Sequence, residues 1–481
     1  MWNWIKSLFT KGKNKVEKTM ENKNEKNHIE NLLKAWENST PRKTMFEGEK
    51  YYRGEQAILN KKRTTFDAEG GERELRNLIN SKIIDNQYSK LVDQKVNYLV
   101  GKPITFKCDN EEYLKKLKTV FDKSFHRKFK YITENALNTG IGWLYPYYDE
   151  NGEFKIRRFD STEILPVYKS KDKEELEMVI RLYKELVLGT SQVLEKVEVY
   201  KRDGVDRYIR KQSILTTEIL NIPYVTYAGE EEQGYNWEKL PFIPFRYNQQ
   251  EIPLIARVKS IQDAINEILS TFHDNMAEDS RKTLLVLVNY DGSSLEEFVN
   301  MKEMGVIKVS TVDGTQGDVK ALQLKVDTNN YKTALEVLKR ALIENGRGFD
   351  AKDERMGANP NQMNIQSMYA DIDLDANNME TEFQAALEQL IWFVNVHLGM
   401  GEDVDLQVIF DRDVLVNETQ TIENIQKSIG ILSSETLISQ HPYIDDPKKE
   451  IERVKKEKEE RIDQYNNAFP NTGSGMNGQE E

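Results

Sequence analysis

Cysteine is almost absent from this sequence, which contains a single one, Cys108, among 481 residues. A disulfide framework is therefore excluded, and such a chain is typical of a reducing compartment. Cys108 has no histidine near it in the sequence, so we expect a buried or half-buried structural thiol. Long apolar runs are missing too, since none approaches the roughly 20 residues that span a bilayer.

The motifs of nucleotide and metal chemistry are also missing. No glycine-rich loop ends in Gly-Lys-Ser or Gly-Lys-Thr, which argues against a nucleotide-driven motor. The stretch GIGWLY at 140–145 lacks the third glycine of a dinucleotide fingerprint. No two of the five histidines have zinc-ligand spacing; they are His28, His126, His273, His397 and His441. The sequence therefore predicts no catalytic centre, no cofactor and no metal site.

Positive charge is in short supply, because 68 lysines and arginines face 80 aspartates and glutamates, a net charge of −12. Proteins that hold nucleic acid tightly through its phosphates are normally basic in at least one domain. The acidity argues against tight DNA binding, although not against a protein past which DNA slides. The length of the chain predicts about two to four domains. A content of 38% apolar and 31% charged residues indicates that these domains have much surface and bury part of it on assembly.

Residues 1–27 form the only strongly basic segment, with seven lysines against three glutamates. Its apolar residues could place a short helix on a membrane surface, with the lysines on lipid phosphates. Those residues are Trp2, Trp4, Ile5, Leu8 and Phe9. Because so short a segment binds lipid weakly, we expect a disordered arm and no membrane partner.

Residues 28–250 have the pattern of one α+β lobe. The stretch NQYSKLVDQKVNYLVGKP predicts a helix with a broad apolar face, capped by Gly101 and ended by Pro103. Two β-hairpins are predicted, at Asn151-Gly152 and at Asp203-Gly204, because these turn residues separate strand-like runs. The lobe closes with LPFIPFRYN.

The pattern changes to that of a long helix over 251–280. Its apolar residues recur every three or four positions, which indicates the seam of a helix packed lengthwise against other helices. The seam residues are Val258, Ile261, Ile265, Ile268 and Phe272. A second such helix is predicted over 328–349, and residues 281–327 between the two predict a small β-α-β-β module.

A polar loop at 350–364, DAKDERMGANPNQMN, precedes a long predicted helix over 365–399. Within that helix, four acidic residues match positions 1, 3, 5 and 12 of a calcium loop: Asp371, Asp373, Asp375 and Glu382. Ala376 stands where the sharp turn of such a loop needs glycine, and the helical pattern continues on both sides. We therefore interpret the stretch as an acidic helix face rather than a calcium site.

The remaining residues predict a mainly helical unit over 400–465, after a strand in DVDLQVIF. Ser433 or Ser434 can cap one helix, and Asp446 can cap the next, with Pro447 at the first helical position. Residues 466–481, rich in asparagine and glycine, predict a disordered tail.

The order of these parts resembles the portal, or head-to-tail connector, proteins of tailed bacteriophages, of the kind found in siphophages of Gram-positive hosts. The resemblance covers roughly residues 30–462 and departs from the family in the lysine-rich arm. It rests on YYRGEQAI, NQYSKLVDQKVNYLVGKPI, LPFIPFRYN followed by VKSIQDAINEILS, and ILSSETLISQHPYIDDPKKEIERVKKEKEER. None of these is an active-site motif, but four in this order are specific.

The resemblance implies a ring of about twelve copies around a channel at the capsid vertex, through which double-stranded DNA is packaged and ejected. It implies contacts with the terminase large subunit, neck or head-completion proteins, and the major capsid and scaffolding proteins. Its location would be the virion, and the host cytoplasm during assembly. The implied parts are a wing at 28–250, stem helices at 251–280 and 328–349, a clip at 281–327, a tunnel loop at 350–364, a joining helix at 365–399 and a crown at 400–465.

Two sets of site residues follow from these implied roles. The tunnel loop would line the channel with mixed charges and amides that bind phosphate weakly, through Lys352, Asp353, Glu354, Arg355, Asn359, Asn361 and Asn364. Gly357 and Pro360 would keep the loop from extending either neighbouring helix. The clip helix would dock partners through Glu296, Glu297 and Lys302. A passive linker at 350–364, an intracellular helical scaffold or adaptor that encloses no nucleic acid, and an enzyme with an unrecognised site remain as alternatives.

Overall fold

A computed structural model describes most of the chain and divides it into two units. The first unit comprises Met1–Phe349 and Asp371–Asp413, and the second comprises Asp350–Ala370 and Val414–Glu481. The described residues are 24–66, 72–74, 79–187, 189–228, 232–279, 283–288, 318–323, 328–350, 362–401, 406–412, 417–444 and 446–468. Within them, every helix is too short or too polar to cross a membrane.

The first unit contains two antiparallel sheets, which confirms the α+β class. A three-stranded sheet has the order β13-β4-β5, and a five-stranded sheet has the order β10-β9-β8-β7-β6. Their strands are β4 (Ile141–Tyr148), β5 (Phe154–Phe159), β6 (Ile164–Tyr168), β7 (Leu176–Leu186), β8 (Val193–Lys201), β9 (Gly204–Lys211), β10 (Ile214–Ile222) and β13 (Ile243–Arg246). The β4–β5 and β8–β9 pairs are the two hairpins predicted at Asn151-Gly152 and Asp203-Gly204.

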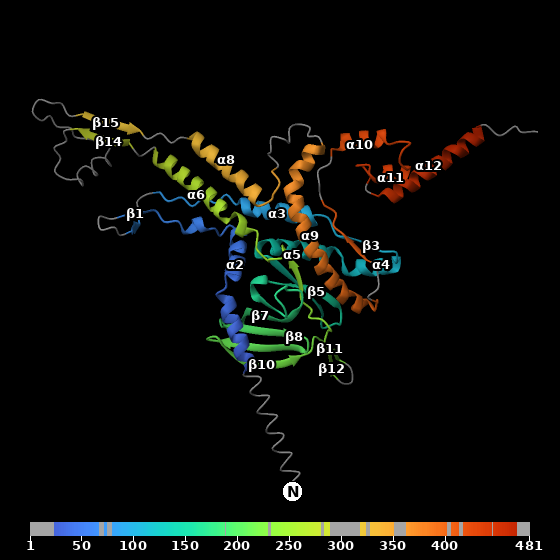
Figure 1. The fold of residues 1–481 in the computed structure, drawn as a ribbon, viewed down its shortest axis with the longest axis horizontal. Helices are drawn as coiled ribbons and strands as arrows, with labels where there is room; N and C mark the ends of the chain where they lie inside the picture. Colours follow the sequence, from blue (N-terminus) through green and yellow to red (C-terminus); the bar gives the residue numbers. More distant parts are fainter. Residues whose placement is uncertain are drawn as a thin grey trace, which may run out of the picture. The chain divides into compact units, whose positions relative to one another are not determined.

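The two sheets share an aromatic core. Trp143, Tyr145 and Phe159 of the smaller sheet pack with Tyr200 and Val205 of the larger one. The other face of the larger sheet is covered by a helix over residues 24–37, the lowest helix in Figure 1. That helix buries Ile29, Leu33 and Trp36 at helical spacing against alternate strand residues such as Val197 and Val199. The central strands β7, β8 and β9 therefore bury apolar residues on both faces of the larger sheet.

Four further helices complete the lobe: α2 (Thr40–Tyr52), α3 (Gln87–Val100), α4 (Glu111–Val120) and α5 (Lys123–Thr139). Gly101 is the C-cap of α3, as predicted, and Ser39, Asn86, Asn110 and Asp122 are side-chain N-caps of the four. Gly48 allows α2 to cross α5 closely, because a Cβ there would lie 1.8 Å from the carbonyl oxygen of Asn138.

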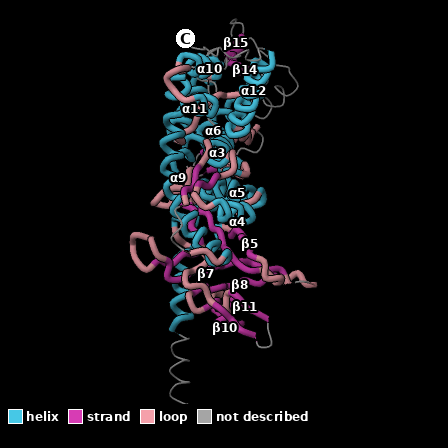
Figure 2. Tube along the Cα trace, turned by 90° about the vertical axis from the view of Figure 1, so that its right-hand side faces the viewer, coloured by secondary structure: helices cyan, strands magenta, loops and turns pink. Residues whose placement is uncertain are grey.

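Two helices extend from this lobe, α6 (Ile255–Asp279) and α8 (Thr328–Asn345), and they pack against each other. At their far end β14 (Thr283–Val288) pairs antiparallel with β15 (Asp318–Gln323). Figures 1 and 2 both place this ribbon away from the five-stranded sheet. Residues 289–317 of the predicted module lie outside the described residues.

Short strand pairs complete the first unit. They are β1 (Thr64–Phe66) with β2 (Glu72–Glu74), β11 (Val225–Ala228) with β12 (Glu232–Tyr235), and β3 (Thr105–Lys107) with β16 (Gln407–Ile409). A short 3-10 helix lies at Ala57–Asn60 and another at Ser161–Glu163. Because β16 pairs with β3, this strand belongs to the first unit, which continues to Asp413. The crown expected over 400–465 remains a prediction.

The long helix α9 runs from Gln362 to Leu398 without a break at residues 371–382, which confirms a helix there instead of a calcium loop. The part of α9 from Asp371 onward belongs to the first unit and its first residues to the second. The second unit also contains α10 (Glu418–Lys427), α11 (Ser434–Ser439) and α12 (Pro447–Ala468). Ser433 caps α11, and the Asp446 side chain accepts a bond from the Lys449 amide at the start of α12, as predicted.

Candidate functional site

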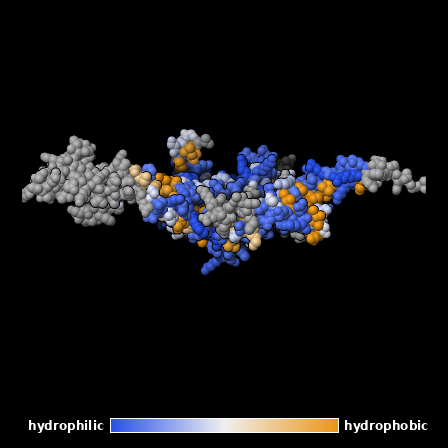
Figure 3. All heavy atoms as spheres, turned by 90° about the horizontal axis from the view of Figure 1, so that it is seen from above, coloured by the Kyte–Doolittle hydropathy of each residue, from blue (hydrophilic) through white to orange (hydrophobic). Residues whose placement is uncertain are grey.

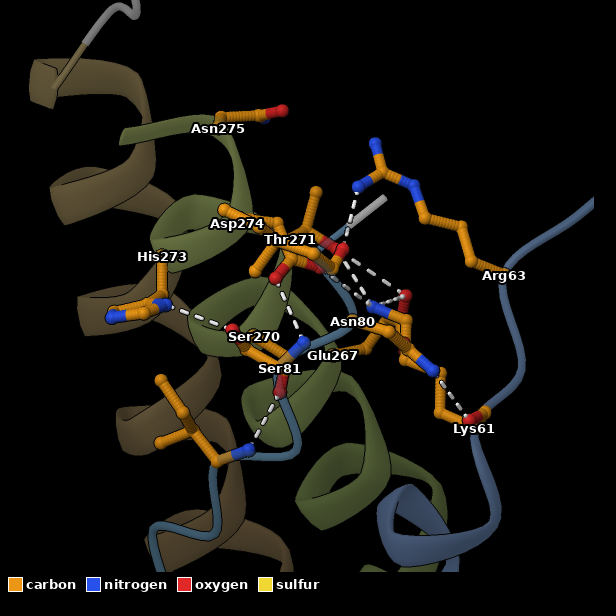
Figure 4. A network of polar contacts seen from close by, with 12 residues as sticks. Lys61, Arg63, Asn80, Ser81, Glu267, Ser270, Thr271, His273, Asp274 and Asn275 are labelled. Carbon is orange, nitrogen blue, oxygen red and sulfur yellow. Dashed lines mark hydrogen bonds and ion pairs between the residues drawn. The ribbon is translucent and has the colours of Figure 1, made fainter. Parts of the chain in front are cut away.

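Helix α6 carries a stripe of buried polar residues that its apolar seam does not reveal. Gln262, Asn266, Ser270 and Asp274 follow one another at intervals of four residues, and each is at most 3% exposed. We call these four residues the polar ladder. They face residues 79–86, an extended segment without a strand partner, which we call the strap. Figure 4 shows the upper part of this contact, where Ser81 lies beside Ser270 and Asp274.

Each ladder side chain accepts a hydrogen bond from a backbone amide in the strap or at the start of α3. The four bonds are Ser81 N–H to Asp274 Oδ1 at 2.8 Å, Ile83 to Ser270 Oγ at 2.9 Å, Asp85 to Asn266 Oδ1 at 3.0 Å and Tyr88 to Gln262 Oε1 at 3.0 Å. Four helical residues advance about 6 Å, and two extended residues advance about 6.6 Å. Helix and strap therefore stay in register over the three strap bonds, and the fourth bond comes from Tyr88 in the first turn of α3.

The physical reason for a polar stripe in this position is the strap's backbone. Buried amides need acceptors, and an extended segment outside a sheet has no neighbouring strand to supply them. The side chains of α6 supply the acceptors instead. Gln262 also donates to the carbonyl oxygen of Asp85 at 2.8 Å, so this part of the strap is bonded in both directions.

The YYRGEQ motif binds the same helix from another side. The Tyr51 hydroxyl donates to Asp263 at 2.6 Å, and Asn266 donates to the Gln56 side chain at 2.5 Å. Beyond the motif, Lys61 forms an ion pair with Glu267 of α6 at 3.0 Å, and Figure 4 shows both residues. This motif thus fixes α6 to the α+β lobe.

Replacing Asn266 with leucine tests the ladder. The change leaves the Asp85 backbone amide and the Gln56 side-chain oxygen Oε1 without a partner, and each unsatisfied buried group costs about 1–3 kcal/mol. We expect the free energy of unfolding to fall by about 2–4 kcal/mol, measured by urea denaturation, and faster hydrogen exchange at Asp85. Ser260→Leu places the same side chain on an exposed position of α6 and is the control. Equal stability of the two variants would contradict the ladder's role.

The predicted apolar seam of α6 is divided between two environments. Val258 and Ile265 are fully buried within the chain, whereas Ile261, Ile268 and Phe272 are half-buried. The ring of Phe272 lies 5.1 Å from that of Tyr331 at the start of α8. That the seam packs against neighbouring copies therefore remains a prediction. Only its half-buried residues still have apolar surface that a neighbouring copy could contact.

A buried carboxylate on α9 joins this helix to α3, to α6 and to the residues after α8. Asp375 of α9 is 4% exposed and lies among three cations and a tyrosine. Its partners are Lys95 Nζ at 2.8 Å, the Tyr247 hydroxyl at 2.6 Å, Arg257 Nη1 at 3.0 Å and Arg347 Nη1 at 3.5 Å. Lys95 also donates to the carbonyl oxygen of Arg347, just after α8. One side chain thus connects α3, α6, the end of α8 and α9.

The charge of Asp375 is maintained by these partners. Burial raises the pKa of its carboxyl group, but Lys95, Tyr247 and Arg257 outweigh burial and hold the pKa below its ordinary value. The sequence indicated an acidic helix face here. Asp371 does lie exposed on it, but Asp375, one turn later, does not. Among the described residues, no group of three histidine, cysteine or acidic side chains could hold a metal ion.

Most of the expected tunnel-loop and clip residues lie outside the described part of the chain. For the loop these are Lys352, Asp353, Glu354, Arg355, Asn359 and Asn361, and for the clip they are Glu296, Glu297 and Lys302. Asn364 is described and lies half-buried in the first turn of α9. Cys108 is partly buried, as expected.

Comparison with known families defines the class of protein to which this fold belongs. The family model "Phage portal protein, SPP1 Gp6-like" matches residues 12–464. The chain therefore belongs to this portal protein family, whose members are structural components of phage particles. It is a ring-forming part of the head-to-tail junction at the capsid vertex, through which the phage genome is packaged and ejected.

Two curated relatives agree with the family. The portal protein of Bacillus phage SPP1 is 28% identical over 444 residues, which cover 89% of this chain and 86% of that protein. The portal protein of Clostridium phage phiCD119 is 27% identical over 443 residues, covering 89% of this chain and 96% of the relative. The alternative of a scaffold or adaptor protein finds no support in these relatives.

A solved structure is also similar, but distantly. A chain from the neck of a native GTA particle matches with a TM-score of 0.36 and 13% identity, over 72% of this chain and 87% of that chain. A likeness of that size carries no argument about the present protein.

Proposed function

We propose that about twelve copies close into a ring and that the stem helices α6 and α8 pack around its DNA channel. The match to the portal family over residues 12–464 is the observation that carries this proposal. The polar ladder supports it, because a helix held by three bonds to the strap and one to α3 keeps a fixed direction from the wing lobe. Ile261, Ile268 and Phe272 would then contact a neighbouring copy.

Exposed apolar side chains in the second unit also support assembly. Ile429 is 67% exposed and Ile431 is 80% exposed, between α10 and α11, and Leu432 and Tyr443 are exposed nearby. Figure 3 shows hydrophobic patches on an otherwise mainly hydrophilic face of the protein. Apolar groups gathered on a surface mark sites that a partner covers, and in a ring the neighbouring crown would cover them.

In this proposal residues 350–364 line the narrowest part of the channel, and DNA passes without sequence-specific contacts. The terminase large subunit supplies the energy of packaging, so the portal itself turns over no substrate. Neck or head-completion proteins replace the terminase afterwards. The major capsid and scaffolding proteins surround the wing during assembly in the host cytoplasm.

The ring is tested by imaging the purified protein. We expect negative-stain micrographs to show closed rings with an axial opening, and native mass spectrometry to give one dominant mass near twelve chains. A wild-type protein that stays monomeric at micromolar concentration in both measurements would overturn the ring.

The clip is tested by reversing its charges. The β14–β15 ribbon lies far from the wing sheets (Figures 1 and 2), so changes in the adjoining module should not disturb the ring. We expect Glu296→Lys, Glu297→Lys and Lys302→Glu together to leave assembly intact, since surface changes usually fall within about 0.5 kcal/mol. They should weaken packaging, because interface charges control association. Ring yield and packaged DNA are measured side by side in a complementation assay, and normal packaging would place the docking surface elsewhere.

A further inference from the structure

Three arginines meet at one edge of the core between the two wing sheets. They come from different strands, Arg157 from β5, Arg181 from β7 and Arg207 from β9. The guanidinium groups of Arg157 and Arg181 each lie 4.6 Å from the centre of the Phe159 ring. Arg181 and Arg207 both contact the carboxylate of Glu198, at 3.5 and 3.2 Å. We call these three residues the arginine rim.

The carboxylates beneath the rim are already occupied. Glu198 is 6% exposed and also accepts a bond from Tyr200 at 2.7 Å, and Glu163 takes Arg181 at 2.9 Å. Three guanidinium groups thus share two carboxylates, which leaves one positive charge in excess. Within the described part of the chain that excess falls on Arg157, which is exposed and contacts no carboxylate.

Arg157 is held by aromatic rings instead. Its guanidinium carbon lies 4.8 Å from the Tyr145 ring, 5.2 Å from the Tyr147 ring and 4.6 Å from the Phe159 ring. A guanidinium packed on rings loses little further freedom on binding, and its N–H groups remain available for a bidentate acceptor. Arginine and tyrosine are also the residues that most often dominate protein interfaces.

We propose that the arginine rim is a docking surface for an acidic segment of another protein, with Arg157 as the anchor for an aspartate or glutamate carboxylate. The planar guanidinium matches a carboxylate in a two-bond arrangement. The partner is expected to be acidic because its charge must complement the excess positive charge of the rim. This excess is a local feature, since the chain as a whole has a net charge of −12. A nucleic acid is disfavoured, since it needs many phosphate contacts and the rim has one unpaired cation.

The test is a binding measurement with a fluorescent octaglutamate peptide on the purified full-length protein at low salt. We expect Arg157→Gln to weaken binding about tenfold, as loss of a charge-assisted bidentate pair does, and Arg157→Lys to give an intermediate loss. Arg202→Gln removes an exposed arginine that already pairs with Glu175, and should change binding less than about twofold. No binding by the wild type, or equal losses at both positions, would overturn the proposal.

Two further readouts decide which partner occupies the rim. A duplex DNA probe that binds the wild type and loses affinity in Arg157→Gln would overturn an acidic protein partner. Rings that are lost in an Arg157→Gln variant of unchanged melting temperature would mean that a neighbouring copy occupies the rim, which also overturns it. The proposal itself does not depend on the ring, so a wild type that binds the peptide without forming rings would refute only the proposed function.

Discussion

Replacing Asp375 with asparagine is expected to lower the free energy of unfolding by about 3–5 kcal/mol, the cost of breaking a buried ion pair by removing one partner. The change leaves Lys95, which is 4% exposed, without a counter-charge. It also loosens Arg257 and Arg347, whose positions at α6 and after α8 depend on the same carboxylate. Urea denaturation followed by circular dichroism measures the loss.

The same variant should change the response to acid. The pKa of Asp375 is lowered in the folded protein, so its stabilising effect is complete above the unfolded value of about 4. That effect disappears as the pH falls through the lower folded value. We therefore expect the stability difference between wild type and Asp375→Asn to shrink below about pH 4. Asp371→Asn, at an exposed position one turn earlier in α9, is the control and should change little. A difference that persists undiminished to pH 2 would contradict the ionised carboxylate.

Replacing Ile265 with aspartate is expected to cost on the order of 5 kcal/mol, because it removes a buried aliphatic side chain and buries an unpaired charge. Ile265 is 0% exposed within a single chain. The loss should therefore appear in the stability of the isolated protomer as well as in ring assembly. Thermal denaturation and the yield of folded protein measure the first effect.

Ser260→Asp is the matched control, since it adds the same charge at an exposed position of α6. A protomer that unfolds normally with Ile265→Asp but no longer forms rings would show that Ile265 packs between copies rather than within one. Phe272→Ala gives the complementary case. The Phe272 ring is only half-buried within the protomer, where it packs against Tyr331. Because its remaining surface would contact a neighbouring copy, we expect the substitution to weaken assembly more than it lowers protomer stability.

Local features of this fold could be read from the sequence because their causes are local. The turn residues Asn151-Gly152 and Asp203-Gly204 select tight hairpins wherever strands flank them. Asp446 and Pro447 begin a helix because one side chain caps free amides and the other residue has no amide to cap. The three-and-four spacing of apolar residues predicted α6, since periodicity alone defines a helical face.

The contacts between distant segments were decided only by the tertiary structure. Gln262, Asn266, Ser270 and Asp274 have a visible spacing of four, but a polar stripe on a helix ordinarily faces water. It became a binding site for the strap because that segment brings buried amides with no strand to receive them. Nothing within the sequence of α6 encodes this partner.

The acidic residues of α9 show the same limit. Asp371, Asp373 and Asp375 are alike in the sequence and alternate along one helix, yet only Asp375 is buried. Its burial depends on Lys95, Arg257 and Arg347, which are between 28 and 280 positions away in the chain. The sequence by itself determined that these elements are helices. Which side of α9 faces the core, and therefore which charge must be paired, was set by the contacts of Asp375 with α3, with α6 and with Arg347 after α8.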